Sequence, residues 1–281
     1  MSALALGCVA ALCWAFHDLC VRFLSQRTPI SACLFTVLVV GLVLHAGLLL
    51  ATETSPALPA AAMLPAVFAG VCFVVATIGL YISFQRGPVR LVAPLIASYP
   101  VFSIAWAVLN GADVTLWQWL AVLAIVAGVG WVAALSDSAD DEVPPIGPTI
   151  GFALLATLGF AGTFAFGQMA ADLSHEIAAT LLTRIVAVIV AAAALLLARQ
   201  PFWPGRPALG WLVAMGAADF LALWSVMAAG PLPDAEFAAV TASMFGLLTI
   251  LLAWIFLRER MTAAQWLGCA VAFAGVGYLA L

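Results

Sequence analysis

The sequence predicts an all-α polytopic membrane protein with ten transmembrane helices, arranged as two inverted five-helix repeats. Of its 281 residues, 66% are hydrophobic and 8% are charged, with a mean hydropathy of +1.20. A soluble domain carries about 25% charged residues. Apolar runs follow one another along the whole chain. In addition, the segment TLWQWLAVLAIVAGVGWVA at 115–133 returns as TAAQWLGCAVAFAGVGYLA at 262–280, at an offset of 147 residues.

Each apolar run holds roughly the 20 residues that a helix needs to cross a bilayer core of about 30 Å. The expected spans are 3–24, 30–51, 62–84, 90–109, 115–135, 149–171, 176–198, 207–229, 235–256 and 262–281. Short connections such as RTPIS, QRGPVR and GPLPDAE contain the turn-forming residues and most of the charge. The first run lacks the basic region and cleavage site of a signal peptide, so we expect it to remain as a helix.

The longest polar stretch is SDSADDEVPPIGP, which lies between the fifth and sixth spans. We interpret residues 1–135 as the first repeat, 136–148 as an acidic linker and 149–281 as the second repeat. The duplicated segment is then the fifth helix of each repeat. Because five is odd, the second repeat must begin on the opposite side of the membrane, which makes the two repeats inverted.

The arginines support the inversion independently. All nine basic residues are Arg, and eight of them lie at connections that the inverted topology places on one face of the membrane. These eight are Arg22, Arg27, Arg86, Arg90, Arg199, Arg206, Arg258 and Arg260. The positive-inside rule makes this face cytoplasmic and puts both termini outside, in the inner (plasma) membrane of the cell. With a net charge of −4 and no basic patch, we expect no nucleic-acid partner.

Small residues recur within one helical turn in both copies of the duplicated segment, at 127–130 and 274–277. Small side chains let two helix backbones approach closely in lipid. The motif could contact substrate, but we interpret it as a packing face between the repeats or between subunits. The six cysteines all lie in apolar segments and are expected to be small buried hydrophobes.

The last 31 residues, from Leu251 to Leu281, resemble the end of an EamA-type domain of the drug/metabolite transporter superfamily. The matching positions are Ala253, Trp254, Glu259, Arg260, Thr262, Gln265, Gly268 and Ala274 to Val276. The first half repeats the pattern with YPVFSIAW at 99–106, Thr115, Gln118 and 127–129. The chain departs from the family where Gly-Glu-Arg is replaced by RER and GAD, and where the ninth span lacks the proline that the fourth has at Pro100. We therefore expect an asymmetric cavity.

The resemblance implies a secondary carrier that exports small metabolites, and amino acids are the cargo it favours most. Within the superfamily, the chain is similar to the aromatic amino-acid exporters of the YddG type. Transport would proceed by alternating access, driven by protons or facilitated. Drugs and nucleoside or purine metabolites are the alternative cargo. An intramembrane enzyme and a non-transporting receptor are the alternatives of another class. No HExxH or GxSxG motif is present, and three unrelated histidines do not suggest a metal or haem, so we expect no cofactor.

An inverted-repeat carrier binds its substrate near the bilayer midplane. A central charge there costs roughly 2.5–3.5 kcal/mol, so polar residues deep in the spans are the candidates. The candidate substrate-binding residues are Trp14, His17, Asp18, Tyr81, Tyr99, Ser103, Trp106, Gln168, Arg184, Asp219, Trp224 and Ser243. Because bent helices often line cavities, Pro94 and Pro100 favour the span 90–109 as a lining element.

Two groups of charges have alternative interpretations. Trp14 and Asp18 share one helix face, where Asp18 could bind an amino group, relay a proton, or pair with Arg22 at the helix end. Arg184 and Asp219 lie in consecutive spans, and could form a buried ion pair that fixes packing or present Arg184 to a substrate carboxylate. We expect His45 to be a packing residue.

Overall fold

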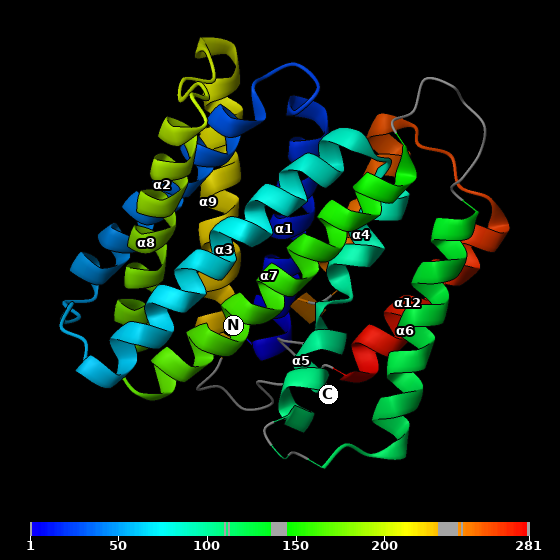
Figure 1. The fold of residues 1–281 in the computed structure, drawn as a ribbon, viewed down its shortest axis with the longest axis horizontal. Coiled ribbons are helices and arrows are strands. Elements are labelled where there is room, and N and C mark those ends of the chain that lie inside the picture. Colours follow the sequence, from blue (N-terminus) through cyan, green and yellow to red (C-terminus); the bar gives the residue numbers. More distant parts are fainter. Residues whose placement is uncertain are drawn as a thin grey trace.

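The computed structural model describes residues 2–109, 111, 113–135, 145–229, 241–242 and 244–279, and these residues fold without any strand (Figure 1). The helices are α1 (Ala3–Leu24), α2 (Ile30–Ala51), α3 (Ala60–Arg86), α4 (Val89–Ala97), α5 (Tyr99–Leu109), α6 (Leu116–Ala134), α7 (Ile146–Asp172), α8 (Glu176–Leu197), α9 (Arg206–Ala229), α11 (Phe245–Leu252), the π-helix η1 (Ala253–Leu257) and α12 (Ala263–Leu279). The all-α class predicted from the sequence is confirmed.

Within the described part of the chain, seven helices are long and apolar enough to cross a membrane, namely α1, α2, α3, α6, α7, α8 and α9. Two shorter apolar segments follow, Phe245–Leu257 and Ala263–Leu279. The spans expected at 3–24 and 30–51 coincide with α1 and α2. The first part of the span expected at 235–256, and most of the expected linker, lie outside the described residues, so a total of ten spans stays a prediction.

The Thr and Gln of the duplicated segment start a helix in both copies. At the start of α6, the Thr115 hydroxyl accepts the backbone N–H of Gln118, while the Gln118 side chain accepts the N–H of Thr115. Thr262 and Gln265 make the same two bonds before α12. This capping box satisfies N–H groups that a helix start leaves without partners. The motif therefore specifies where these two helices begin.

The expected span 90–109 consists of two helices, α4 and α5, which meet at Ser98. Pro100 has no N–H to donate to a preceding turn, and the residue before a proline disfavours the helical conformation. The Ser98 hydroxyl donates to the carbonyl of Leu95, 2.6 Å away. The bend predicted from the two prolines is therefore a break in the helix, and it lies beside the cavity described below.

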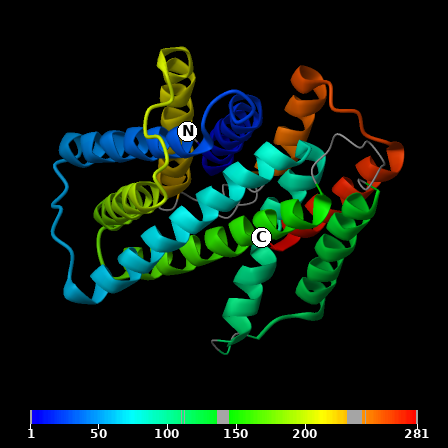
Figure 2. The ribbon, with the colours of Figure 1, turned by 45° about the horizontal axis from the view of Figure 1, so that its top comes forward.

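The helix contacts follow a twofold pattern. α3 packs along α7 and α1 along α9, while α3 contacts α8 and α9 contacts α2. The pairs α2–α8, α4–α11 and α6–α12 each join helices at the same position of the two repeats. Figure 2 shows α3 and α7 side by side across the molecule. Such a pattern is what two repeats related by a twofold axis in the membrane plane would produce.

Two glycines of the duplicated segment show why α6 and α12 approach so closely. A Cβ added to Gly128 would lie 2.5 Å from the carbonyl oxygen of Gly268. A Cβ added to Gly275 would lie 2.7 Å from the carbonyl oxygen of Ala121. Gly275 and Gly268 follow Gly128 and Ala121 by the offset of 147, so the two contacts are equivalent. The small residues are thus a packing face between α6 and α12, as interpreted from the sequence.

The connections that carry the eight arginines lie together at the upper edge of Figure 1. Hydrogen bonds join several of them: the Ser31 hydroxyl, at the start of α2, donates to Pro201 in the α8–α9 connection (3.1 Å). The connections α2–α3 and α7–α8 lie at the lower edge (Figure 1). We call these two ends of the bundle the arginine edge and the opposite edge.

Candidate binding cavity between the helices

A cavity of about 390 Å³ lies between the helices, with walls from α1, α2, α3, α5, α7, α8, α9 and α11. Its lining on α7 runs from Phe160 to Ala171, in the C-terminal half of that helix, and on α8 it begins at the exposed Glu176. On α9 the lining continues to Val226, close to the C-terminal end. These helix ends belong to the opposite edge, whereas Leu34 and Tyr81, the lining residues toward the arginine edge, are buried, so the cavity extends toward the opposite edge.

A row of three polar side chains lies on one wall. His17 Nδ1 is 3.1 Å from Asp18 Oδ1, and His17 Nε2 is 3.3 Å from the Tyr81 hydroxyl. Asp18 is only 2% exposed. Its second carboxylate oxygen, Oδ2, is buried and has no hydrogen-bond partner among the described residues. Because buried polar atoms almost always have a partner, this oxygen is unusual.

An ion pair lies on another wall. Arg184 Nη1 is 2.6 Å from Asp219 Oδ2, which joins α8 to α9. The Arg184 guanidinium also lies over the Phe73 ring, 4.7 Å from its centroid. Gly41 of α2 leaves room for this arrangement, since an added Cβ would lie 3.0 Å from Arg184 Nη1. The buried ion pair considered from the sequence is therefore present.

Aromatic rings form most of the remaining wall. Trp14 and Phe245 meet edge to face with centroids 5.9 Å apart, and Tyr99 contacts Phe164 at 5.1 Å. Phe160 precedes Phe164 by one turn on the same face of α7. A cavity with apolar and aromatic walls and a few convergent polar groups is typical of a site for a small organic molecule.

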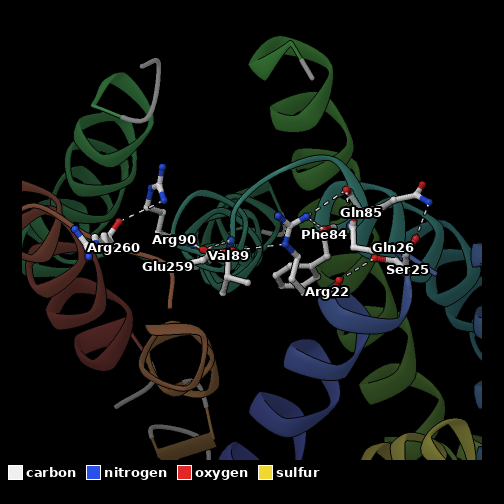
Figure 3. Close-up of polar contacts among 9 residues, drawn as sticks. All are labelled: Arg22, Ser25, Gln26, Phe84, Gln85, Val89, Arg90, Glu259 and Arg260. Atoms are coloured by element: carbon white, nitrogen blue, oxygen red, sulfur yellow. Dashed lines mark hydrogen bonds and ion pairs between the residues drawn. The ribbon is translucent and has the colours of Figure 1, made fainter. Parts of the chain in front are cut away.

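Polar contacts close the bundle at the arginine edge, between α1 and the end of α3 (Figure 3). Arg22 Nη1 donates to the carbonyls of Phe84 (2.9 Å) and Gln85 (3.2 Å). Gln26 Nε2 donates to the Gln85 carbonyl, and Gln85 Nε2 donates to the Ser25 carbonyl, both at 2.9 Å. Arg22 and Gln26 thus satisfy carbonyls at the C-terminal end of α3 that have no partner within the helix.

Glu259, in the connection between η1 and α12, extends this network to α4 (Figure 3). Its Oε1 lies 3.5 Å from Arg22 Nε, and its Oε2 accepts the backbone N–H groups of Val89 (2.9 Å) and Arg90 (3.5 Å). Arg90 Nη1 donates in turn to the Arg260 carbonyl. Because Pro88 offers α4 no capping side chain, Glu259 caps that helix from the other half of the sequence. We call Arg22, Glu259 and the start of α4 the closing contacts.

Eight of the residues singled out from the sequence line the cavity: Trp14, His17, Asp18, Tyr81, Tyr99, Gln168, Arg184 and Asp219. Trp224 is not among the lining residues, and its side chain is 36% exposed. Ser243 and the side chains of Ser103 and Trp106 lie outside the described residues. The pair Asp18–Arg22 does not form, because Arg22 binds the end of α3 and Glu259 instead.

Sequence reasoning missed several lining residues, which are Phe73, Thr77, Phe160, Thr163, Phe164, Glu176 and Thr180. An aromatic or threonine in an apolar span does not reveal whether it faces lipid or a cavity. His45 is fully buried, with Nδ1 3.0 Å from the Gly41 carbonyl and its ring edge-on to Phe220, as expected of a packing residue. Within the described ranges, no group of three or more His, Cys, Asp or Glu side chains could hold a metal ion.

Comparison with known proteins gives matches to a protein family and to solved structures. The model of the EamA-like transporter family matches residues 1–134 and again residues 147–281. A solved structure described only as "Crystal structure of protein" superposes with a TM-score of 0.67 at 16% identity, over 98% of this chain and 95% of that one, and so shares the fold. A search of curated proteins gave no match.

Proposed function

This chain belongs to the EamA-like transporter family of the drug/metabolite transporter superfamily. From that premise we propose that it exports small amphipathic metabolites by alternating access, and that amino acids are its main cargo. One observation carries the proposal: the cavity extends toward the opposite edge of the bundle, while polar contacts join the helices at the arginine edge. A carrier that works by alternating access must have such a closed edge in each of its states. If the arginine edge is cytoplasmic, the cavity faces outside here.

The walls of the cavity support amino acids as cargo. A volume of about 390 Å³ is within the range of roughly 300–1,000 Å³ typical of small-molecule sites. The rings of Trp14, Phe73, Tyr99, Phe160 and Phe164 suit an apolar or aromatic side chain, whereas the few buried charges suit a charged end group. Planar nucleoside or purine metabolites and aromatic drugs are the alternative cargo, because the same rings can stack on them.

Solute flux into proteoliposomes tests the proposal. Uptake of labelled amino acids, with competition by other amino acids, nucleosides and cationic drugs, should exceed that of empty liposomes. Gly167 lines the cavity, and an added Cβ there meets no atom within 4 Å, so Gly167→Leu should fill the cavity and block flux. Gly210 has equally open space but lies exposed on α9, so Gly210→Leu should transport normally.

If none of these solutes crosses faster than in empty liposomes, the transport proposal is wrong. If nucleosides or drugs cross the membrane and amino acids do not, nucleosides or drugs are the cargo and amino acids are not. Equal flux through Gly167→Leu and Gly210→Leu would show that the cavity described here is not the path of the substrate.

A further inference from the structure

Asp18 is a buried carboxylate on the wall of the described cavity, and one of its two oxygens has no partner. Its Oδ1 contacts His17 Nδ1 at 3.1 Å, whereas its Oδ2 has no hydrogen-bond partner among the described residues. A buried charged oxygen without a partner is costly, and the cost is removed when a cation or donor reaches it. The last torsion of an Asp side chain has a broad energy well, so the carboxylate can adjust its orientation to an incoming donor.

The charges around Asp18 favour a cation as its partner. Arg184 and Asp219, from α8 and α9, neutralise each other across 2.6 Å. The remaining titratable groups on the cavity walls are His17, Tyr81, Tyr99 and, at the mouth, Glu176. Besides the Arg184–Asp219 pair, the described lining contains the carboxyl groups of Asp18 and Glu176 and no further Lys or Arg to pair with them. An added cation would therefore be bound more favourably than an added anion.

The geometry around Arg184 argues against it as an anchor for a carboxylate. Its guanidinium is already engaged by Asp219 and by the ring of Phe73, 4.7 Å away, and the residue is 2% exposed. A substrate carboxylate would have to displace a buried ion pair and would leave Asp219 without its partner. Breaking such a pair is strongly unfavourable.

The groups beside Asp18 suit an ammonium joined to an apolar or aromatic body. Trp14 precedes Asp18 by one turn on the same face of α1, and both line the cavity. An aromatic face is a favourable neighbour for a cation. The Tyr81 hydroxyl contacts His17 Nε2 at 3.3 Å, so the imidazole is held at both nitrogens and keeps Asp18 Oδ1 occupied.

We propose that Asp18 Oδ2 is the binding site for the ammonium group of the cargo, and that no group in the cavity requires a carboxylate. The site then takes primary amines that lack a carboxylate as well as amino acids. This inference rests on the proposed function, because it names the chemical group by which the carrier holds its substrate. Arg184 and Asp219 shape the cavity and do not bind the charged ends of the cargo.

Three ligands with one phenyl body separate the contributions of the two end groups. Phenylethylamine has only the ammonium, 3-phenylpropionate only the carboxylate, and phenylalanine both. Binding is measured with the purified full chain, by titration calorimetry or thermal shift. Phenylethylamine should bind at least as tightly as phenylalanine, and 3-phenylpropionate should not bind. Asp18→Asn should weaken both amines by about tenfold or more, the typical loss for a hydrogen bond to a charged group.

Asp113→Asn is the matched control, because it removes one carboxylate from an exposed position that does not line the cavity. If Asp18→Asn does not fold, binding of the three phenyl ligands to the unmodified protein is sufficient to test the assignment. Binding of 3-phenylpropionate, absence of phenylethylamine binding, or amine affinity unchanged in Asp18→Asn would each overturn the assignment. Flux of phenylalanine that is equal in wild type and Asp18→Asn would overturn it as well and would leave the transport function standing.

Discussion

Replacing Glu259 by Gln removes one charge from the closing contacts and leaves a side chain of the same shape. The Gln amide oxygen can still accept the N–H of Val89, which Glu259 accepts at 2.9 Å. What is lost is the pairing with Arg22, at 3.5 Å, and the attraction between a carboxylate and the N-terminus of α4. We expect the variant to open the arginine edge more often than the wild type does.

The two lost interactions determine how much the closed state is destabilised. A charge at a helix N-terminus contributes about 0.3–1 kcal/mol. An ion pair with partial exposure contributes about 0.2–1 kcal/mol, and here the side chains of Arg22 and Glu259 are 24% and 13% exposed. The closed state should therefore lose about 1 kcal/mol, which is roughly a fivefold change in the ratio of closed to open. Glu259→Ala also loses the helix cap, at about 1 kcal/mol more, and should change the ratio roughly thirtyfold.

Distances between spin labels can report this ratio. Arg27 follows α1, which carries Arg22, and Ala263 begins α12, just after Glu259, and both residues are exposed. Labels on cysteines at these positions, with the native cysteines replaced, should move apart when the edge opens. The longer distance should gain population in the order wild type, Glu259→Gln, Glu259→Ala. Glu53→Gln makes the same chemical change at the exposed opposite edge and should have no effect.

An unchanged distance distribution in Glu259→Ala, in a protein that remains folded by thermal shift, would refute the reasoning. It would mean that the contacts drawn in Figure 3 persist in both states or contribute nothing to the difference between them. An equal shift in Glu53→Gln would show that the effect comes from net charge and not from the closing contacts.

Three further predictions concern other parts of the molecule. Arg184→Gln should destabilise the protein by about 3–5 kcal/mol because it leaves Asp219 buried without its partner, and the double variant with Asp219→Asn should recover part of this loss in thermal unfolding. Gly128→Leu should disrupt the packing of α6 on α12 and lower the yield of folded protein in detergent, whereas Gly130→Leu, with open space beside it, should not. Asp18→Asn should flatten the pH profile of transport, because it removes a titratable group from the cavity; an unchanged profile would remove Asp18 from any proton relay.

Much of the fold could be predicted from the sequence because a bilayer leaves few alternatives. Every backbone polar group in the hydrocarbon must be satisfied internally, so each long apolar run must be a helix. The expected and observed limits of α1 and α2 therefore agree. The break at Ser98 was only partly predicted: Pro94 and Pro100 indicated a bend, whereas the structure has two separate helices, with Ser98 at the end of α4.

The cavity was harder to predict, because burial in protein and exposure to lipid select the same residues. Phe160 and Phe164 of α7 have no sequence signal that separates them from Leu154 or Leu158, which are exposed on the same helix. Charged residues do carry a signal, since a charge inside a span is costly unless the protein uses it. That is why Asp18, Arg184 and Asp219 could be identified as candidates from the sequence alone, while the aromatic wall could not.

The twofold pattern of the helices contrasts with the one-sided distribution of the charges. Helix α1 carries Asp18 well inside it, but its counterpart α7 has no acidic residue before Asp172 at its end. Likewise α9 carries Asp219, whereas its counterpart α3 has no acidic residue at all. The packing of α1 on α9 brings both acidic residues to the same cavity. Under the alternating access proposed above, the two repeats would exchange the open and closed edges of one scaffold, while both states would use the same acidic residues of α1 and α9.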